Sequence, residues 1–224
     1  MPVAIAACHR AGVRIVMITG DDPITAEAIA REIELCRGEP LTMTGPQLDM
    51  VSDDELGRFI ERGEIVFARV APEHKLRLVQ AFQRTGAVVA VTGDAVNDAP
   101  ALKAADIGIA MGATGSDVAR AAADMVLLDD SFGSIAAAIE QGRAVYENIR
   151  KFLTYVLVHN VPEAAAFIAF ILLGIPLPLT AIQVLAIDLG TEVLPALALG
   201  GEAAEPDTMR RPPRNRRERL LDRE

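Results

Sequence analysis

The sequence has few cysteines, and their placement argues against a disulfide framework or a zinc site. Cys8 and Cys36 are the two cysteines among 224 residues, and neither belongs to a CxxC motif or a Cys/His cluster. A disulfide framework or a structural zinc site needs several cysteines at short, regular spacings. The cysteine content therefore favours two reduced thiols in a cytosolic compartment.

A basic surface is also missing from the main body of the chain. Residues 1–151 hold 15 Lys and Arg against 22 Asp and Glu, and the whole chain carries a formal net charge of −9. Domains that bind nucleic acid gather Lys and Arg on one face, because the phosphate backbone is negatively charged. The acidic balance therefore argues against nucleic acid as a partner.

What the sequence does have is an alternation of short apolar runs with amphipathic stretches, up to about residue 150. We expect strands at Arg14–Thr19, Ile65–Arg69, Val88–Thr92, Ile107–Met111 and Met125–Leu128. We expect helices near residues 23–35, 73–85, 98–105, 116–123 and 133–150. This alternation predicts a doubly wound α/β domain with parallel strands and crossover helices. Ligands of such domains bind at the carboxyl ends of the strands.

Two long apolar stretches follow the alternating region. Residues 152–174 contain a single formal charge, Glu163, and residues 180–200 contain two, Asp188 and Glu192. Each stretch is long enough to cross a bilayer, because a membrane-spanning helix needs about 20 residues. The alternative is a soluble protein that buries two helices with a few carboxylates in its core. Length and flanking charge together favour a transmembrane hairpin.

Basic residues beside the hairpin predict its orientation. The first stretch is preceded by Arg143, Arg150 and Lys151, and the second is followed by the arginines of residues 210–223. Lys and Arg accumulate on the cytoplasmic side of membrane helices. We therefore expect both chain ends in the cytoplasm and the Pro-rich turn at residues 175–179 on the other side of the membrane.

Thr19-Gly20-Asp21 forms a polar turn between a predicted strand and a predicted helix, with Pro23 near the first helical position. A hydroxyl, a closely approaching backbone and helix N-terminal amides together suit a phosphoryl oxygen. An ordinary helix cap explains such a turn equally well.

The segment Thr92–Asp98 carries a more specific pattern. Asp94 and Asp98 lie four residues apart around a predicted strand-to-helix turn, with Asn97 between them. Mg²⁺ prefers one or two carboxylates together with waters and a phosphate, so this segment predicts a magnesium site. The alternative is a pair of helix-capping aspartates.

Lys75 stands at the start of the predicted helix between these two polar loops. A cation in that position could neutralise the charge that develops on a transferring phosphoryl group. Taken alone, the residue is equally typical of an exposed surface lysine.

Polar residues recur on one face of each apolar stretch. Asn160 and Glu163 are spaced i, i+3 in the first stretch, while Asp188, Thr191 and Glu192 are spaced i, i+3 and i+4 in the second. Ionised groups at membrane depth are costly, so they predict an ion pathway. The alternative is that these carboxylates are protonated and serve only the packing of the helices.

Pro162 and Pro195 lie close to these carboxylates. Proline removes a backbone N–H donor and leaves a carbonyl oxygen without its helical partner. Such carbonyls can join carboxylates as cation ligands, as they do in transporter helices that are interrupted at the binding site.

Three segments of the chain carry a family resemblance: TGDDPITAEAIA, FARVAPEHKLRLVQAFQ and TGDAVNDAPALKAADIGIAMG. They resemble the phosphorylation domain of P-type ATPases, which has the haloacid-dehalogenase-like, Rossmannoid α/β fold. The resemblance implies a partial phosphorylation domain over residues 1–150, with a parallel sheet and flanking helices. Two transmembrane helices would follow over residues 151–200, and a basic cytoplasmic tail over residues 201–224.

The resemblance also implies roles for individual residues. Thr19 and Lys75 would contact the aspartyl phosphate, and Gly20 and Asp21 would lie beside them on the nucleotide and hinge side. Catalytic support would come from Thr19, Asp21, Lys75, Asn97 and Asp98. Asp94 would bind Mg²⁺, and Asp98 would share that metal loop and order it.

Two positions in these loops depart from the family pattern. Ala95 stands where the family usually has Gly, and Asp22 stands where it usually has His. A glycine required for positive φ would make Ala95 a source of strain of about 1 kcal/mol. We therefore expect a weakened Mg²⁺ loop if the backbone is left-handed at that residue.

The apolar stretches resemble the fifth and sixth transmembrane helices of type II pumps that move calcium or sodium and potassium. The segments concerned are YVLVHNVPE and IPLPLTAIQVLAIDLGTEVLPALALG. The resemblance implies a transported cation of the Ca²⁺, Na⁺ or K⁺ class, bound by Asn160, Glu163, Asp188, Thr191 and Glu192. His159 stands where a small hydroxyl residue is common, and we expect it to be structural or to alter selectivity or proton coupling.

The phosphorylated aspartate of this family lies in an Asp-Lys-Thr-Gly-Thr segment, and the 224 residues contain no such segment. That aspartate sits on a central strand of the fold, so we expect the sheet to lack its middle. We also expect this chain alone to form no covalent phosphoenzyme.

The resulting hypothesis is a part of a P-type ATPase that couples ATP hydrolysis to cation transport. Mg²⁺ and ATP would be its cofactors, the missing N-terminal half of the pump its partner, and the cell membrane its multi-pass location. One alternative is a non-catalytic membrane fragment that modulates a full-length pump. Another is a phosphatase of the haloacid-dehalogenase class, against which the missing nucleophile counts.

Overall fold

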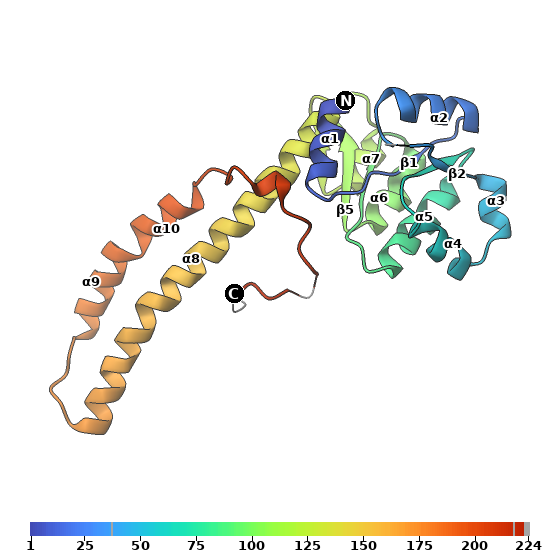
Figure 1. Cartoon of the computed structure of the whole chain (residues 1–224). Coiled ribbons are helices and arrows are strands. Elements are labelled where there is room, and N and C mark those ends of the chain that lie inside the picture. Colours follow the sequence, from blue (N-terminus) through green and yellow to red (C-terminus); the bar gives the residue numbers. More distant parts are fainter. Residues whose placement is uncertain (37, 217, 222–224) are drawn as a thin grey trace. The chain divides into compact units, whose positions relative to one another are not determined.

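The computed structural model describes residues 1–36, 38–216 and 218–221 (Figure 1). These residues form two compact units. The first consists of residues 1–138 together with 209–216, and the second of residues 139–208 together with the described part of 217–224. The first unit holds the α/β fold and the second the apolar hairpin.

The first unit contains two parallel sheets of three strands each among its described residues. In one sheet, β1 (Met17–Ile18) and β2 (Leu41–Thr44) both pair with β3 (Ile65–Ala68). In the other sheet, β4 (Ala90–Gly93) and β6 (Met125–Leu127) both pair with β5 (Ile107–Met111). The five expected strands are therefore present, and the parallel α/β class is confirmed.

The sequence-based prediction missed β2 and made β1 too long. β2 is a run of four residues between Pro40 and Gly45, which is short for recognition from its pattern alone. In β1 only Met17 and Ile18 pair with β3, opposite Val66 and Phe67. Ile15 and Val16 are apolar but have no strand partner among the described residues, so they stay irregular.

The two sheets leave an incompletely covered strand at one edge of each. Among the described strands, β1 has β3 as its single neighbour and β4 has β5. All residues of β3 are buried, whereas Ala90 and Thr92 of β4 are exposed, and Val88 just before it is 61% exposed. Parallel sheets normally bury both faces of their strands. This arrangement agrees with the expectation that the sheet lacks its middle.

Helices connect the strands of the first unit. They are α1 (Pro2–Arg10), α2 (Pro23–Glu32), α3 (Gly45–Met50), α4 (Asp53–Ile60), α5 (Pro72–Arg84), α6 (Ala99–Ala104) and α7 (Asp117–Ala122), with a 3₁₀ turn η1 (Val96–Asp98). Pro23 and Pro72 occupy the first positions of α2 and α5, where a missing N–H costs nothing. α4 begins with a capping box between Ser52 and Glu55, a signal that the sequence-based prediction did not use.

The larger apolar core of this unit fixes α5 against its neighbours. Leu78 and Phe82 of α5 belong to one cluster with Leu56, Ile60 and Phe67. Burying such a side chain stabilises the fold by about 1.5–3 kcal/mol. The packing sets the position of the α5 N-terminus, which carries Lys75.

The second unit is dominated by α8 (Phe132–Leu173), which begins in the first unit and continues without interruption through Pro162. The helix expected at 133–150 and the apolar stretch at 152–174 are therefore one helix. A connection without regular structure leads to α9 (Ala181–Thr191), and α10 (Val193–Gly200) follows. Figure 1 shows α9 and α10 running back beside the second half of α8.

The second apolar stretch is interrupted at Glu192, between α9 and α10. Pro195 cannot donate a hydrogen bond to the carbonyl of Thr191, its partner four residues earlier. The Tyr155 hydroxyl of α8 donates to that carbonyl oxygen over 2.6 Å. The proline therefore frees a carbonyl, as predicted, but a tyrosine from the other helix satisfies it.

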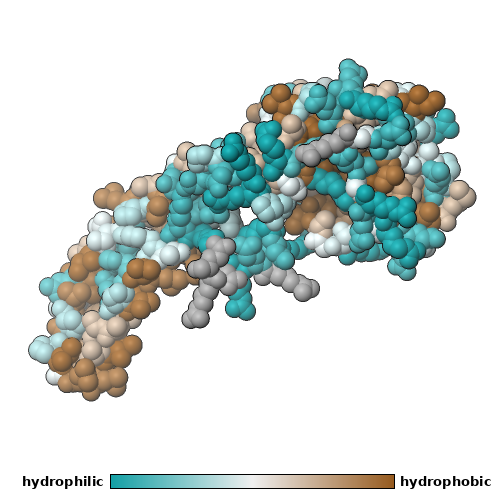
Figure 2. Space-filling view, in the orientation of Figure 1, coloured by the Kyte–Doolittle hydropathy of each residue, from teal (hydrophilic) through white to brown (hydrophobic). Residues whose placement is uncertain are grey.

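Both helical stretches are long and apolar enough to cross a membrane. Figure 2 shows hydrophobic residues gathered over the end of the hairpin where α8 and α9 are joined. Large apolar side chains are exposed there, including Ile171, Leu172, Leu173, Ile182 and Leu185. A soluble monomer rarely exposes apolar area of this extent, so lipid is the natural solvent of this surface.

The basic residues around the hairpin make defined contacts. Lys151 forms ion pairs with Glu202 at 2.6 Å and with Glu205 at 2.9 Å. In the first unit Arg216 pairs with Asp106 at 3.0 Å. Arg217 and Arg223 of the predicted basic tail lie outside the described residues.

Candidate functional site

The structure joins Lys75 and Asp98, which come from different helices. The Nζ atom of Lys75, in the first turn of α5, donates to Oδ1 of Asp98 over 2.5 Å. Asp98 is 3% exposed, while the Lys75 side chain keeps 29% of its surface exposed. An ammonium group has three donors, so this pair leaves part of the lysine able to meet a further anion.

The second carboxylate oxygen of Asp98 organises the loop after β4. Oδ2 accepts hydrogen bonds from the backbone N–H groups of Asp94 and Ala95, both over 3.2 Å. Burial alone would raise the pKa of Asp98, but the hydrogen bonds and charge of Lys75, together with these two N–H donors, bring it below its ordinary value. Gly93 is needed beside it, because an added Cβ would lie 2.6 Å from the Asp98 Cβ.

The carboxylate of Asp94 and the amide of Asn97 are on exposed residues of the same loop. The backbone of Asp94 is held from the other side, where its carbonyl oxygen accepts from Ser116 N over 2.7 Å. The loop is therefore fixed by its backbone, and the Asp94 side chain remains available to a ligand.

The prediction of strain at Ala95 is wrong. Ala95 has φ −95° and ψ 160°, which is ordinary extended backbone. No left-handed conformation occurs at this residue, so alanine replaces glycine here without a conformational penalty.

Asp130 is a supporting residue that the sequence-based prediction missed. Its carboxylate accepts hydrogen bonds from the backbone N–H groups of Gly112, Ala113 and Thr114 and from the Thr114 hydroxyl, over 2.7–3.0 Å. These hydrogen bonds hold the pKa of Asp130 below its ordinary value, the Thr114 hydroxyl contributing most. The clamped turn leads directly to Ser116, which holds Asp94. The acidic pair Asp129-Asp130 directly after a predicted strand was the available signal.

Thr19 and Asp21 form a pair of their own at the carboxyl end of β1. The Thr19 hydroxyl donates to Oδ2 of Asp21 over 2.9 Å, and it accepts from the Asp21 N–H over 3.2 Å. The carbonyl of Asp21 accepts from Arg69 N over 2.8 Å, which ties the turn to the end of β3. Gly20 between them is exposed.

The helix cap in this turn is Asp22, so the capping interpretation does not apply to Thr19. Asp22 accepts from the N–H groups of Ile24 and Thr25 and from the Thr25 hydroxyl. These bonds, led by that of the Thr25 hydroxyl, lower the pKa of Asp22. Asp22 therefore caps α2 in the place where the family pattern usually has His.

His74, next to Lys75, is a second residue that the prediction missed. Its buried ring accepts from Ala71 N at Nδ1 over 3.1 Å, and Nε2 lies 2.9 Å from Asp49 Oδ1. With Nδ1 as the acceptor, Nε2 carries the proton and donates to Asp49. The imidazole therefore caps the helix turn from which Lys75 extends.

Lys75 meets the supported carboxylate loop after β4. The Thr-Asp turn follows β1 in the other sheet, and none of the hydrogen bonds above joins it to that loop. Asp94 offers the hard oxygen donor that Mg²⁺ prefers, whereas Asp98 is already engaged by Lys75 and two amides. The donor set therefore fits one Mg²⁺ whose remaining ligands are waters and a phosphate. The geometry suits the handling of a phosphoryl group.

The hairpin brings the predicted polar residues of its two stretches together. The Asn160 amide donates to Glu192 Oε1 over 2.7 Å, across the two helices. The Thr191 hydroxyl lies 3.2 Å from His159 Nε2, and it donates to the Ile187 carbonyl over 2.8 Å. All of these polar side chains are on half-buried residues of the hairpin.

Asp188 and Glu163 complete the polar cluster. Asp188 Oδ1 is buried and has no hydrogen-bond partner among the described residues. Glu163 Oε1 lies 3.8 Å from His159 Nε2. Ligand atoms of His159, Asp188 and Glu192 all lie within 4.8 Å of one another, a spacing that could enclose a metal ion.

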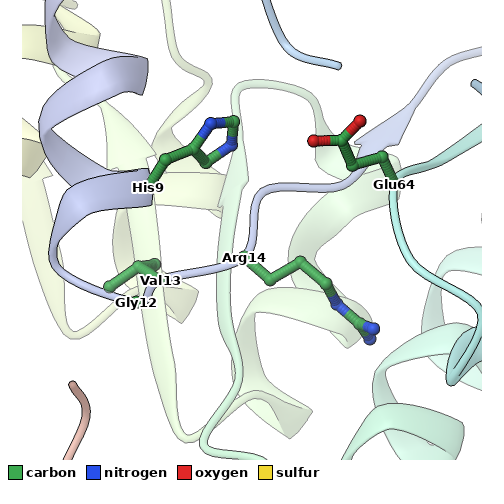
Figure 3. A pocket seen from close by; sticks show the side chains of 5 residues that line it. All are labelled: His9, Gly12, Val13, Arg14 and Glu64. Atoms are coloured by element: carbon green, nitrogen blue, oxygen red, sulfur yellow. The ribbon is translucent and has the colours of Figure 1, made fainter. Parts of the chain in front are cut away.

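One shallow pocket of about 270 Å³ lies elsewhere in the first unit. Figure 3 shows its lining residues His9, Gly12, Val13, Arg14 and Glu64. The Arg14 guanidinium donates to the Ile60 carbonyl over 2.7 Å and lies 5.1 Å from the Phe82 ring centre. The pocket shares no residue with the loops described above, so it is not their ligand site.

Comparison with protein families gives matches over both units. The haloacid dehalogenase-like hydrolase family matches residues 2–106, and a second family of the same description matches residues 75–139. The family described as cation transporting ATPase, C-terminus, matches residues 176–224.

Curated proteins similar to this chain are cation-transporting ATPases. A calcium-transporting ATPase of Bacillus subtilis (strain 168) is 50% identical over 98% of the chain and 25% of its own length. A sodium/potassium-transporting ATPase subunit alpha of Drosophila melanogaster is 46% identical over 96% of the chain and 23% of its own length. The chain thus spans about a quarter of the length of these relatives.

A solved structure agrees with these sequence matches. The crystal structure of a zinc-transporting PIB-type ATPase in the E2.Pi state superposes with a TM-score of 0.64 and 32% identity. The superposition covers 89% of this chain and 27% of the solved one. The likeness therefore extends over most of the chain.

Proposed function

The chain belongs to the P-type cation-transporting ATPases, and we propose that it supplies the phosphate-handling loops and part of the ion pathway of an ATP-driven cation pump. The observation that carries this proposal is the Lys75–Asp98 pair beside the exposed Asp94 carboxylate. A structural ion pair alone would not need a supported loop that leaves a neighbouring carboxylate and part of the lysine accessible.

The α/β unit would act on the phosphoryl group by position and charge. Lys75, held by Asp98, would direct its remaining N–H donors to a phosphoryl oxygen. Thr19 would offer its hydroxyl to the same group once it turns away from Asp21. Asp94 would hold Mg²⁺, which when bound neutralises charge on the phosphoryl oxygens. The residue that accepts the phosphoryl group of ATP would be an aspartate outside these 224 residues.

The hairpin would carry the transported cation. Asn160 contacts Glu192 across the two helices, and both helical stretches are long and apolar enough to cross a membrane. Glu163, Asp188 and Thr191 would complete the cation site. The named relatives move sodium and potassium, calcium or zinc, so the family alone does not fix the cation. We place the protein in the cell membrane as a multi-pass protein, with both ends of this hairpin in the cytoplasm.

The first test is the size of the polypeptide that carries these residues. An immunoblot of native membranes with an antibody against residues 210–224 should show a band several times heavier than 23.9 kDa. A band near 24 kDa that copurifies with a complete pump would instead support a non-catalytic modulator. A soluble band would contradict the membrane assignment.

The second test is Mg²⁺-dependent ATP hydrolysis by that polypeptide in purified membranes. Asp94→Asn should reduce turnover by at least about 100-fold, because it removes the charged Mg²⁺ ligand. Asp54→Asn, on an exposed residue of α4, is the matched control and should leave turnover unchanged. Normal turnover in Asp94→Asn would remove the basis of the phosphate-site assignment.

A further inference from the structure

The hairpin contains a side-chain group whose chemistry differs from that of an all-oxygen cation site. His159 of α8, Asp188 of α9 and Glu192 at the α9–α10 break each offer one ligand atom within 4.8 Å of the other two. Two of these ligands are carboxylates and the third is an imidazole nitrogen. In the part of the chain that the structure describes, this is the one such group of three or more His, Cys, Asp or Glu side chains.

Asp188 supplies an independent indication that a ligand belongs in this group. Its Oδ1 atom is buried and lacks a hydrogen-bond partner among the described residues. An unpartnered buried carboxylate oxygen is rare and costly, because burial removes its hydration without replacing it. A cation bound through that oxygen would supply the missing partner.

The other two ligands are held in place by neighbouring residues. Asn160 donates to Glu192 Oε1 over 2.7 Å. The His159 ring is stacked on Tyr155 at a centroid distance of 6.2 Å. Its Nε2 lies 3.2 Å from the Thr191 hydroxyl, whose hydrogen goes to the Ile187 carbonyl, so Nε2 carries a proton and Nδ1 is the nitrogen left for a metal. Such outer contacts orient the ligands of metal sites and are typical of them.

The nature of the donors selects the class of ion. Calcium takes six to eight oxygen ligands, and Mg²⁺ likewise prefers oxygen donors. An imidazole beside carboxylates suits first-row transition metals such as Zn²⁺ and Co²⁺. Tetrahedral ligands about 2.1 Å from a metal lie about 3.4 Å apart, so side-chain rotations of little more than 1 Å would close the group.

We propose that His159, Asp188 and Glu192 bind a divalent first-row transition metal, and that His159 makes the hairpin selective for this class of cation. The inference rests on the proposed cation pathway and names its cargo more narrowly. Glu163 Oε1 lies 3.8 Å from His159 Nε2 but is not one of the three ligands, so a fourth ligand would be a water.

The experiment uses the full chain in lipid nanodiscs, stripped of metal and titrated with Zn²⁺, Co²⁺ or Ca²⁺ alone. Zn²⁺ should bind at least tenfold more tightly than Ca²⁺, and Co²⁺ should give the intense visible absorption of a four-coordinate site. His159→Gln should weaken Zn²⁺ binding at least tenfold and change Ca²⁺ binding less than threefold. His9→Gln, on α1, is the matched control and should change neither.

Two further variants separate the possible failures. Asp188→Asn should weaken the binding of Zn²⁺, Co²⁺ and Ca²⁺ alike, because a carboxylate can be a ligand of each of them. If it does so while His159→Gln leaves Zn²⁺ binding intact, His159 is structural and the inference is overturned, although the proposed cation pathway stands. If neither variant changes binding, both assignments fail. His159→Cys should retain Zn²⁺ binding. If this variant has unchanged circular dichroism but no longer binds Zn²⁺, the inference is also overturned.

Discussion

The two polar sites of this molecule differ in how the oxygens of their carboxylates are bonded. In the α/β unit, both oxygens of Asp98 are engaged, one by Lys75 and the other by the N–H groups of Asp94 and Ala95. In the hairpin, one oxygen of Asp188 is buried without a partner among the described residues. The protein itself supplies hydrogen-bond partners to both oxygens of Asp98, whereas one oxygen of Asp188 is left for a ligand to bind.

This difference indicates which charges serve the fold and which serve a ligand. A fully bonded carboxylate stabilises the folded state and orders its loop, so it can be present before any ligand arrives. An unsatisfied one costs stability, and a protein retains such a group where function requires it. Asp98 therefore prepares the site around Asp94, and Asp188 is itself a candidate ligand.

The largest expected effect is at Asp98. Asp98→Ala leaves the Lys75 ammonium and two backbone N–H groups without their acceptor, and it should lower the free energy of unfolding by about 3 kcal/mol. Urea unfolding of the full chain in detergent, followed by circular dichroism, measures this. Asp54→Ala, which removes an exposed carboxylate of α4, should change the free energy by less than about 0.5 kcal/mol. Equal effects of the two variants would contradict the role of Asp98.

Replacing each carboxylate with its amide sharpens the comparison. Asp98→Asn should destabilise the chain by about 2 kcal/mol, because the ion pair with Lys75 is lost. Asp188→Asn should be neutral or stabilise the metal-free hairpin by up to about 1 kcal/mol, because the cost of burying the charge disappears. Steric-trap or denaturant unfolding in bilayer mimetics compares the two. Substantial destabilisation by Asp188→Asn would mean that its carboxylate already has a structural partner.

The pH dependence of stability tests the same pair. The folded pKa of Asp98 lies below its ordinary value, so its ionised form contributes stability above the unfolded pKa of about 3.9. That contribution is lost as the pH falls through the folded pKa. The stability difference between the natural chain and Asp98→Asn should therefore be constant above about pH 5 and shrink below about pH 4. A difference independent of pH would exclude an ionised Asp98 as its source.

A smaller effect is expected at the interruption of the second apolar stretch. Tyr155→Phe removes the donor to the Thr191 carbonyl that Pro195 leaves unpaired, and it should weaken the association of α8 with α9 by about 0.5–1 kcal/mol. Thr154→Val is the matched control, because its hydroxyl donates to the Arg150 carbonyl of its own helix. Equal losses in both variants would show that the Tyr155 bond does not join the helices.

The smallest expected effect is at Ala95. Its φ of −95° requires no glycine, so Ala95→Gly should destabilise the chain by about 0.5 kcal/mol through backbone entropy. A gain in stability in the same unfolding measurement would indicate strain at Ala95 after all.

The elements of the fold were predicted best from the sequence where a hydrophobic periodicity or a fixed motif marks them. β5 was predicted with its full bounds, and the two apolar stretches stood out by length alone. Lys75 and Asp98 follow β3 and β4, which belong to different sheets, so the order of the strands alone does not explain why the two residues meet. The 2.5 Å contact itself depends on how α5 packs, which no local pattern specifies.

What the sequence did not indicate depends on contacts between distant residues. Asp130 supports the turn from Gly112 to Thr114, and His74 pairs with Asp49, and neither partner is visible from local spacing. The strain expected at Ala95 was wrong for a related reason. The family's glycine at position 95 suggested a positive φ. The actual φ is set by the hydrogen bonds on both sides of the loop, which the sequence does not reveal.

The most direct test of the account is cation-dependent phosphorylation by radiolabelled ATP of the membrane polypeptide that carries these residues. The natural protein should incorporate acid-stable phosphate only when its cation is present. Asp94→Asn should abolish incorporation through loss of Mg²⁺, and Asp188→Asn should abolish its dependence on the cation, although the two residues lie in different units. Cation-dependent phosphorylation that survives in both variants would contradict the claim that these two sites serve one ATP-driven transport cycle.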